Sequence, residues 1–114
     1  MTQFRMWLAT YNNPEVDSVD DYLKQWVSRA GAVYCTGQLE RGENGTPHIQ
    51  YFVQFRAQKR LGFLKKHCKK SHFTGVKFNN GADEYTNKEE TRIEGPWSHG
   101  VRPARRNVRG DTAR

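Results

Sequence analysis

The segment that most restricts the fold lies at residues 47–55 (PHIQYFVQF), where apolar and aromatic residues are dense. Such a run, bounded by turn residues, is typical of a β-strand. The residues before it, Gly42, Asn44 and Gly45, are typical of a hairpin loop and follow a second strand-like run at residues 32–39. The sequence therefore predicts two antiparallel strands joined by a hairpin.

The remaining segments supply further strands and helices. Strands are predicted at residues 4–10 and 72–78, with a short edge strand at 96–99, and helices at residues 16–29, 58–67 and 82–93. This order favours an α+β fold, a four- or five-stranded antiparallel sheet (ferredoxin/RRM-like) with helices packed against it. We expect the helices on one face, which leaves the other free to carry a site. We expect residues 1–101 to form one domain, and the Arg-, Gly- and Pro-rich residues 102–114 indicate a basic linker or tail.

Positive charge is concentrated in one part of the sequence. The net charge is +7, and no Asp or Glu occurs between Asn44 and Ala82. A single-sign segment of this length attracts polyanions, which favours a nucleic-acid partner. The side chains expected to bind nucleic-acid phosphates are Lys59, Arg60, Lys65, Lys66, Lys69 and Lys70. A second basic cluster near the C-terminus contains Arg102, Arg105, Arg106 and Arg109.

The sequence argues against a membrane protein and against a disulfide-stabilised secreted domain. No apolar run approaches the ~20 residues of a membrane span, and the N-terminus lacks the apolar core of a signal peptide. Cys35 and Cys68 form neither a CxxC pair nor a disulfide framework. We therefore expect a soluble intracellular protein with two reduced thiols.

A mixed set of metal ligands is predicted at the hairpin. His48 and Gln50 are two residues apart and share one face of their strand, as Gln38 and Glu40 do on the neighbouring strand. Pairing through the hairpin would bring Glu40 close to His48 and Gln50. One imidazole nitrogen, one carboxylate and one amide oxygen suit Mg²⁺ or Mn²⁺. Glu43, in the loop, is the alternative acidic ligand.

A tyrosine and a lysine stand three residues apart in the last predicted helix. Tyr85 and Lys88 would project from one face of that helix. A phenol with a pKa of about 10 is a poor nucleophile at neutral pH, so it needs a nearby cation and a polarised electrophile. Lys88 could supply the cation and the metal site the polarisation. An ordinary core tyrosine would show the same spacing.

Three short segments, in this order, resemble the replication initiator (Rep) proteins of circular single-stranded DNA viruses, the circovirus-like and related groups. Residues 7–14 (WLATYNNP) resemble the origin-recognition motif, residues 45–52 (GTPHIQYF) the metal-binding motif, and residues 84–89 (EYTNKE) the tyrosine motif. The tripeptide at residues 95–97 (GPW) also fits. The resemblance covers about residues 4 to 101.

The resemblance implies an HUH-type endonuclease that nicks single-stranded DNA at an origin stem-loop. It would form a 5′-phosphotyrosine intermediate and a free 3′-hydroxyl for rolling-circle replication, and could rejoin strands. The resemblance assigns Mn²⁺ or Mg²⁺ binding to Glu40, His48 and Gln50. It implies that Tyr85 is the nucleophile and that Lys88 assists Tyr85. It also implies that bases are read by Arg5, Asn12 and Asn13. The family also implies the host nucleus as the location.

The sequence departs from the family pattern at two points. The second histidine that gives the HUH motif its name is Gln50 here, which favours hard, oxygen-preferring cations. The full-length family carries a helicase domain with a G-x-x-x-x-G-K-[ST] loop, and no such loop occurs in this sequence. We expect an excised nuclease domain or a shortened gene product, monomeric by itself and able to form oligomers when a helicase domain is attached.

Two other functions fit parts of the sequence. A non-catalytic single-stranded DNA- or RNA-binding module would need the basic segment and the aromatic residues, but neither H-x-Q nor Y-x-x-K. The usual RNA-recognition signature is absent. A structural zinc domain would use side chains whose spacing matches no common zinc pattern: Cys35, His67, Cys68 and His72.

Overall fold

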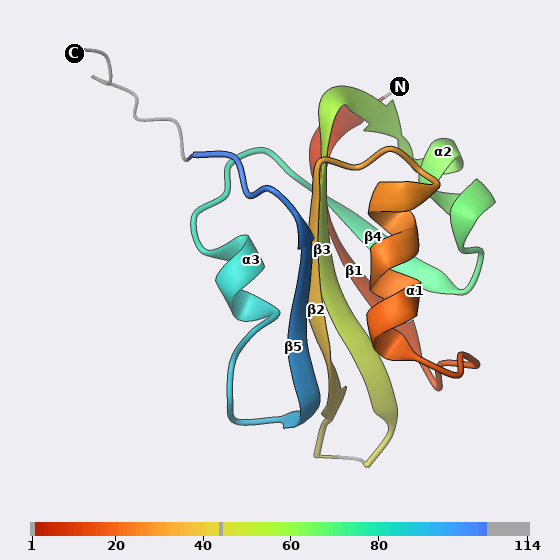
Figure 1. Ribbon diagram of the computed structural model, residues 1–114, viewed down its shortest axis with the longest axis vertical. Helices are drawn as coiled ribbons and strands as arrows, with labels where there is room; N and C mark the ends of the chain where they lie inside the picture. Colours follow the sequence, from red (N-terminus) through yellow and green to blue (C-terminus); the bar gives the residue numbers. More distant parts are fainter. Residues whose placement is uncertain (1, 44, 105–114) are drawn as a thin grey trace.

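The structure, a computed structural model, describes residues 2–43 and 45–104. Its strands form one antiparallel sheet in the order β4-β1-β3-β2-β5 (Figure 1). The strands are β1 (Gln3–Asn12), β2 (Tyr34–Arg41), β3 (Pro47–Arg60), β4 (Ser71–Val76) and β5 (Arg92–Gly100). The helices are α1 (Val19–Ser28), α2 (Leu61–His67) and α3 (Ala82–Tyr85). The predicted α+β fold is confirmed, with five strands in the sheet.

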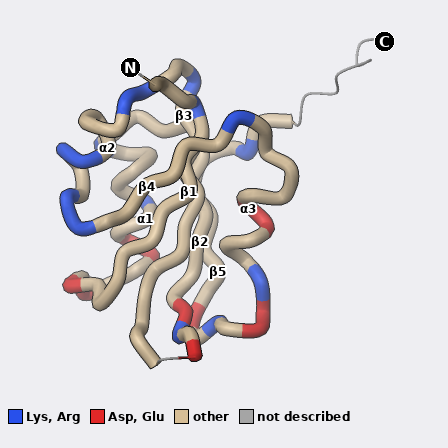
Figure 2. Tube along the Cα trace, turned by 180° about the vertical axis from the view of Figure 1, so that it is seen from behind, with Lys and Arg blue, Asp and Glu red and all other residues tan. Residues whose placement is uncertain are grey.

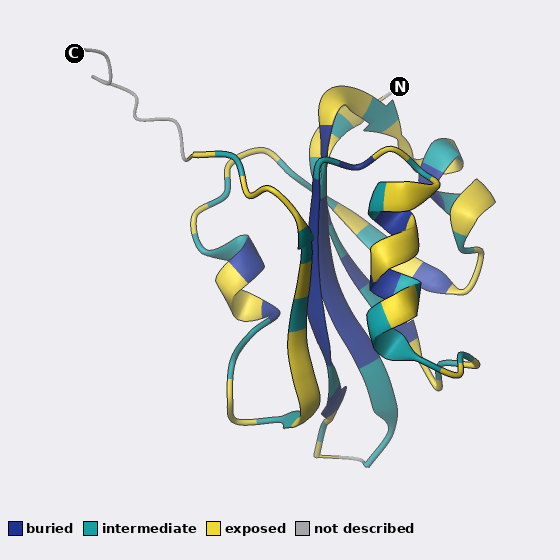
Figure 3. Ribbon diagram, in the orientation of Figure 1, coloured by how far each residue is buried: buried dark blue, intermediate teal, exposed yellow. Residues whose placement is uncertain are grey.

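The two faces of the sheet differ in character. Residues that point toward α1 and α2 are mostly apolar and buried (Figure 3), and we call this the core face. The core contains Trp7, Ala9, Tyr11, Leu23, Trp26, Ile49, Tyr51, Val53, Phe55 and Leu64. Burial of this surface stabilises the fold by roughly 25 cal/mol per Å² of apolar area. The opposite face carries the alternate residues of each strand, and we call it the site face.

Helix α3 lies on the site face, opposite α1 and α2 (Figure 1), so the expectation that all helices share one face is wrong. It also ends at Tyr85, whereas the pattern predicts a helix at residues 82–93. Thr86 Oγ1 and Asn87 Nδ2 donate to the carbonyl oxygen of Asp83 at 2.7 and 3.1 Å. Such side-chain bonds compete with further helical turns, and the chain continues into β5, which pairs with β2.

Two other boundaries differ from the sequence-based prediction. Helix α1 begins at Val19 rather than at residue 16, because Ser18 caps it: the Ser18 Oγ accepts a hydrogen bond from the backbone N–H of Asp21 at 3.1 Å. Strand β3 continues past residue 55, since its far end pairs with the start of β1, where Gln3 lies opposite Arg60. Helix α2 therefore begins at Leu61 rather than at residue 58.

The C-terminal segment is described only in part. Strand β5 pairs with β2 along Arg92–Gly100, so the predicted edge strand at residues 96–99 is confirmed and longer than expected. Of the predicted tail at 102–114, residues 105–114 lie outside the described residues, with the arginines at 105, 106 and 109. Within the described part of the chain, no helix is long and apolar enough to cross a membrane.

Candidate active site

The register of the central strands gathers polar side chains on the site face, near the β2–β3 hairpin. Glu40 of β2 lies opposite His48 of β3, and Gln38 lies opposite Gln50. Thr10 of β1 lies opposite Gln50 from the other side. The hairpin pairing therefore brings together the residues that the sequence analysis selected as metal ligands.

Glu40 and His48 are in direct contact. The distance from Glu40 Oε1 to His48 Nε2 is 3.1 Å, and His48 Nδ1 lies 3.4 Å from the carbonyl oxygen of Thr46. Nδ1 therefore faces a backbone carbonyl oxygen, and Nε2 faces the Glu40 carboxylate. A histidine that ligates a metal is commonly oriented in this way, with one ring nitrogen beside a backbone carbonyl and the other directed at the metal.

The third candidate metal ligand is the side-chain amide oxygen of Gln50, and hydrogen bonds fix its orientation. Gln50 Nε2 donates to the carbonyl oxygen of Ala9 at 3.0 Å, and Gln50 Oε1 accepts from Thr10 Oγ1 at 3.2 Å. An imidazole nitrogen, a carboxylate and an amide oxygen on adjacent strands fit a hard divalent cation. Glu40, and not Glu43, lies beside His48, since Glu43 is exposed in the hairpin turn.

A cluster built only from His, Cys, Asp and Glu is absent: within residues 2–43 and 45–104, no three such side chains gather to hold a metal ion. The alternative zinc set does not come together either. Cys35 is fully buried in the core, and His67 packs against Trp26 and Phe63. The candidate ligand set is not a cluster of this kind, because one of its three members, Gln50, is an amide.

Glu40 is only 2% exposed, yet it is held in the charged form. Burial by itself would raise the pKa of Glu40, but hydrogen bonds from Gln38 Nε2 at 2.7 Å and Lys88 Nζ at 3.0 Å bring that pKa below its ordinary value. The side chain is therefore a carboxylate at neutral pH, the form that binds a metal ion.

Lys88 connects the ligand set to the candidate nucleophile. Its Nζ donates to Glu40 Oε1 at 3.0 Å and to Thr91 Oγ1 at 2.7 Å, and lies 5.1 Å from the centre of the Tyr85 ring. Tyr85 and Lys88 are not on one helix face as predicted, because α3 ends at Tyr85. The turn after α3 nevertheless returns Lys88 to the same side, which places a cation beside a tyrosine that is 49% exposed.

Helix α3 is anchored at both ends of its single turn. Thr86 Oγ1 lies 3.4 Å from the carbonyl oxygen of Thr36, deep on the site face. Asp83 is 3% exposed and forms an ion pair with Arg102, in the segment after β5. Burial would raise the pKa of Asp83, but the hydrogen bond from Arg102 brings it below its ordinary value. The backbone that carries Tyr85 is thus fixed to two separate parts of the fold.

Sequence reasoning gave no role to two residues that hold the site together. Gln38 Nε2 donates both to Glu40 Oε2 at 2.7 Å and to the carbonyl oxygen of Lys88 at 2.6 Å. Arg92 Nε donates to Gln38 Oε1 at 2.8 Å, and Arg92 Nη2 to the carbonyl oxygen of Asn87 at 2.7 Å. The shared face of Gln38 and Glu40 was a signal for the first. Arg92 gave none, because its segment was predicted to be helical.

We expect Gln38→Leu to destabilise the fold by about 2–3 kcal/mol, because Gln38 is fully buried and its loss leaves Glu40 Oε2 and the Lys88 carbonyl oxygen without their hydrogen-bond donor. Urea unfolding followed by circular dichroism measures this effect. The control is Gln54→Leu, which changes a residue of β3 that also points to the site face but lies far from Gln38 and Glu40. It should change the free energy of unfolding by no more than about 0.5 kcal/mol. Equal losses in both variants would contradict a supporting role for Gln38.

The basic side chains predicted to bind phosphate are not gathered around this site (Figure 2). Lys59 and Arg60 end β3 at the far end of the sheet, and residues 65–66 lie in α2 on the core face. Lys69 and Lys70 lie in the turn before β4, where Lys70 forms an ion pair with an acidic residue of the β1–α1 loop. Their predicted role as phosphate ligands stays a prediction.

The residues expected to read bases are split between the two ends of β1. Asn12 lies opposite His48, and the N–H of the exposed Asn13 donates to the carbonyl oxygen of Pro47 at 2.8 Å. Asn13 has a φ of 49°, in the left-handed region that asparagine tolerates. Both asparagines therefore flank the ligand set. Arg5 lies at the other end of β1, where the register with β3 shifts.

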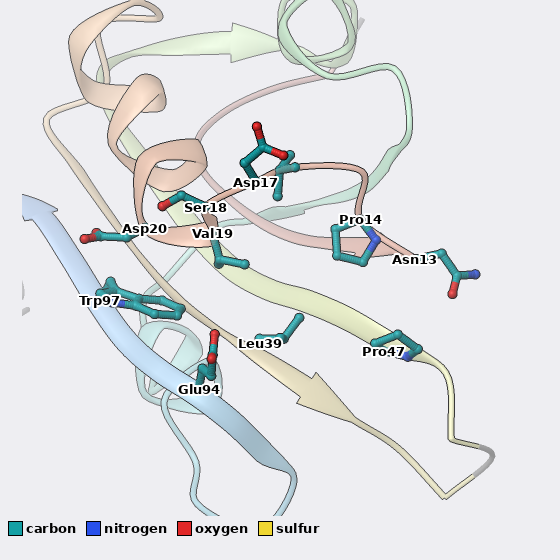
Figure 4. Close-up of a pocket in the computed structure, with 11 residues that line it drawn as sticks. Asn13, Pro14, Asp17, Ser18, Val19, Asp20, Leu39, Pro47, Glu94 and Trp97 are labelled. Carbon is teal, nitrogen blue, oxygen red and sulfur yellow. The ribbon is translucent and has the colours of Figure 1, made fainter.

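A cavity of about 570 Å³ lies at the same end of the sheet but on the core face (Figure 4). Leu39 and Trp97 line it, and Asp17, Asp20 and Glu94 add carboxylates. Side chains alternate along a strand, so Leu39 points away from the ligand set that its neighbour belongs to. Carboxylates around this cavity would repel a phosphate, and we leave it outside the candidate active site.

Residues 4–89 match the protein family described as "Putative viral replication protein". The chain belongs to this family of viral replication (Rep) proteins, as its three motifs indicate. It is 34% identical over 96 residues to the master replication protein of Faba bean necrotic yellows virus (isolate Syrian SV292-88), a match that covers 82% of this chain and 30% of that protein. It is 35% identical over 86 residues to the replication-associated protein of Beak and feather disease virus, covering 75% and 29%. The chain spans less than a third of the length of these curated relatives.

Proposed function

We propose that this chain nicks single-stranded DNA at a viral replication origin, with Tyr85 as the nucleophile. A divalent metal ion held by Glu40, His48 and Gln50 would take part. One observation carries the proposal: Lys88 contacts both the Glu40 carboxylate and the Tyr85 ring, so the ligand set and the tyrosine share one side of the sheet. Membership of a viral replication family supports DNA as the substrate.

In the proposed step, the Tyr85 hydroxyl oxygen attacks the scissile phosphorus in line. A bond forms between this oxygen and phosphorus, and the bond from phosphorus to the 3′ oxygen of the preceding nucleotide breaks. The phenolic proton passes to water, and the 3′ oxygen takes up a proton. The products are a 5′-phosphotyrosine and a free 3′-hydroxyl, the primer that rolling-circle synthesis needs. Because one phosphodiester replaces another, the reverse reaction rejoins strands.

The side chains divide the work. Mn²⁺ or Mg²⁺ in the Glu40–His48–Gln50 set would supply charge stabilisation for the non-bridging phosphate oxygens. Lys88 is placed to offset negative charge beside the tyrosine ring. The other tyrosines are poor candidates for nucleophile because they are buried or half-buried: Tyr11, Tyr22, Tyr34 and Tyr51.

The test follows the DNA label. A single-stranded origin-loop DNA is labelled at its 5′ end or its 3′ end and incubated with the protein and Mn²⁺, then run on a denaturing gel. We expect the 3′ label to migrate with the protein and the 5′ label to mark a free strand that a polymerase extends. Replacing Mn²⁺ by EDTA should lower the adduct at least about 100-fold.

Two outcomes would overturn the proposal. Cleavage that leaves both labels on free DNA would indicate attack by water rather than by tyrosine. Binding of the strand without cleavage, across several viral origin loops and with Mn²⁺ present, would identify a single-strand-binding module instead.

A further inference from the structure

The Glu40 carboxylate presents one of its two oxygen atoms to the candidate metal ligands. Oε2 accepts a hydrogen bond from Gln38 Nε2 at 2.7 Å, and this amide is held in its orientation because Arg92 Nε donates to Gln38 Oε1 at 2.8 Å. Oε1 faces His48 Nε2 at 3.1 Å. Neighbouring ligands of an octahedral Mg²⁺ ion are about 3 Å apart, so these two atoms suit one ion with little movement.

The same oxygen, Glu40 Oε1, is paired with a cation of the protein itself. Lys88 Nζ lies 3.0 Å from Oε1 in an ion pair, and it also donates to Thr91 Oγ1 at 2.7 Å. An ammonium group supplies the positive charge that a buried carboxylate needs. A divalent ion at Oε1 would be only a few ångströms from this ammonium group, and like charges so close repel each other strongly beside a buried carboxylate.

Of the two partners in this ion pair, Lys88 is the one able to move. The Glu40 side chain is 2% exposed on an interior strand, whereas the Lys88 side chain is 28% exposed in the loop between α3 and β5. Gln38 Nε2 donates to the Lys88 carbonyl oxygen at 2.6 Å, which anchors the backbone and leaves the side chain able to turn. The centre of the Tyr85 ring is 5.1 Å from Nζ, so an ammonium group released from Glu40 stays beside the candidate nucleophile.

We propose that Lys88 competes with the divalent cation for Glu40 Oε1, and that binding of the cation releases the Lys88 ammonium group toward Tyr85. The competition lowers the affinity for the cation, and by linkage the cation determines where Lys88 lies. This inference rests on the ligand set of the proposed function, but it is measured without DNA and therefore apart from nicking. A lysine that only held Glu40 in place would act in the opposite direction, since its removal would weaken metal binding.

The first measurement is Mn²⁺ binding to the full chain by isothermal titration calorimetry, at about 0.15 M salt, where exposed charges are largely screened. Lys88→Met removes the charge and keeps most of the apolar stem, and we expect it to bind Mn²⁺ about tenfold more tightly than the unmodified chain. Lys88→Arg keeps the positive charge and should stay within about threefold of the unmodified chain.

The matched control removes a positive charge from the residue next to Glu40 in β2. Arg41 is exposed, and its Nη1 donates to the carbonyl oxygen of Gly45 at 2.9 Å. Arg41→Gln should change the dissociation constant for Mn²⁺ by less than about twofold. Thr91→Val gives a second answer, should Lys88→Met fail to fold. It removes one acceptor of Lys88 Nζ and should tighten Mn²⁺ binding about threefold.

The second measurement follows the position of the ammonium group. Mg²⁺ is added while the ring resonances of Tyr85 are recorded by NMR. In the unmodified chain these resonances should shift as Lys88 leaves Glu40. In Lys88→Met the shift should be lost although Mg²⁺ still binds. An equal shift in both proteins would contradict the movement of Lys88.

The competition is overturned if Lys88→Met binds Mn²⁺ as tightly as the unmodified chain or more weakly, or if Arg41→Gln gives the same gain. Absence of Mn²⁺ binding from the unmodified chain and from every variant overturns the competition together with the metal ligand set of the proposed function. Tighter Mn²⁺ binding by Lys88→Met, with no Tyr85 adduct on origin DNA in the unmodified chain, supports the competition and defeats only the proposed nicking.

Discussion

Tyr85→Phe should abolish the covalent protein–DNA adduct, by about 10⁴-fold or more, because it removes the attacking oxygen itself. The ring that Lys88 covers is kept, and Tyr85 is 49% exposed, so the free energy of unfolding should change by less than about 0.5 kcal/mol. The adduct is measured on a denaturing gel with Mn²⁺ present. Affinity for the single strand, measured in EDTA, should change by less than about twofold.

A buried tyrosine provides the control for this substitution. Tyr22 lies in the core network, where its hydroxyl is 2.7 Å from the Tyr51 hydroxyl, and burial raises the pKa of both phenols above the ordinary value. Tyr22→Phe should cost about 1 kcal/mol of stability and leave the adduct intact. If Tyr85→Phe still forms the adduct, another side chain is the nucleophile and the assignment is wrong.

Glu40→Gln should lower nicking by about 10³-fold, because the substitution removes the only carboxylate of the ligand set and leaves Lys88 without its anionic partner. The shape of the side chain is almost unchanged, so DNA binding in EDTA should persist. The metal has a readout independent of DNA: Mn²⁺ should raise the Tm of the unmodified chain and not that of Glu40→Gln. Differential scanning fluorimetry with and without Mn²⁺ measures this shift.

Glu43→Gln is the matched control, since Glu43 lies three residues further on, exposed in the hairpin turn. This variant should nick DNA at the unmodified rate and keep the Mn²⁺-dependent rise in Tm. The opposite pattern, with Glu43→Gln inactive and Glu40→Gln active, would transfer the ligand role to Glu43. A loss of the Mn²⁺ effect in both variants would indicate a site that spans the hairpin.

The sheet could be predicted because its signals are local. Alternation along residues 47–55 and the hairpin residues before them determine which side chains of β2 and β3 face each other, and the structure agrees. The end of α3 could not be predicted in this way. It depends on Thr86 and Asn87 bonding to the Asp83 carbonyl, and on β5 pairing with β2, which is a contact between distant segments.

The same distinction, between local sequence signals and contacts between distant segments, applies to the residues of the candidate site. Glu40, His48 and Gln50 follow from strand phase and one hairpin, so they could be selected from the sequence. The pairing of Lys88 with Glu40 joins residues 48 positions apart and has no local pattern. The basic residues are close in sequence, but the fold spreads them apart: Lys59 and Arg60 end β3 far from the ligand set, whereas Lys70 directly precedes β4, which begins beside the end of β1. Their role as phosphate ligands stays a prediction.

Alternate residues of strand β3 have two different roles, one in the candidate site and one in the hydrophobic core. His48 and Gln50 point to the site face, while Ile49 and Tyr51 are fully buried on the core face. Deleting one residue within this run would turn the side chains on one side of the deletion to the opposite face of the sheet, so both the core and the candidate site would be lost. The hairpin turn before Pro47 is not part of this alternation. We expect sequence lengths to vary at that turn among functional variants and to stay constant along residues 47–53.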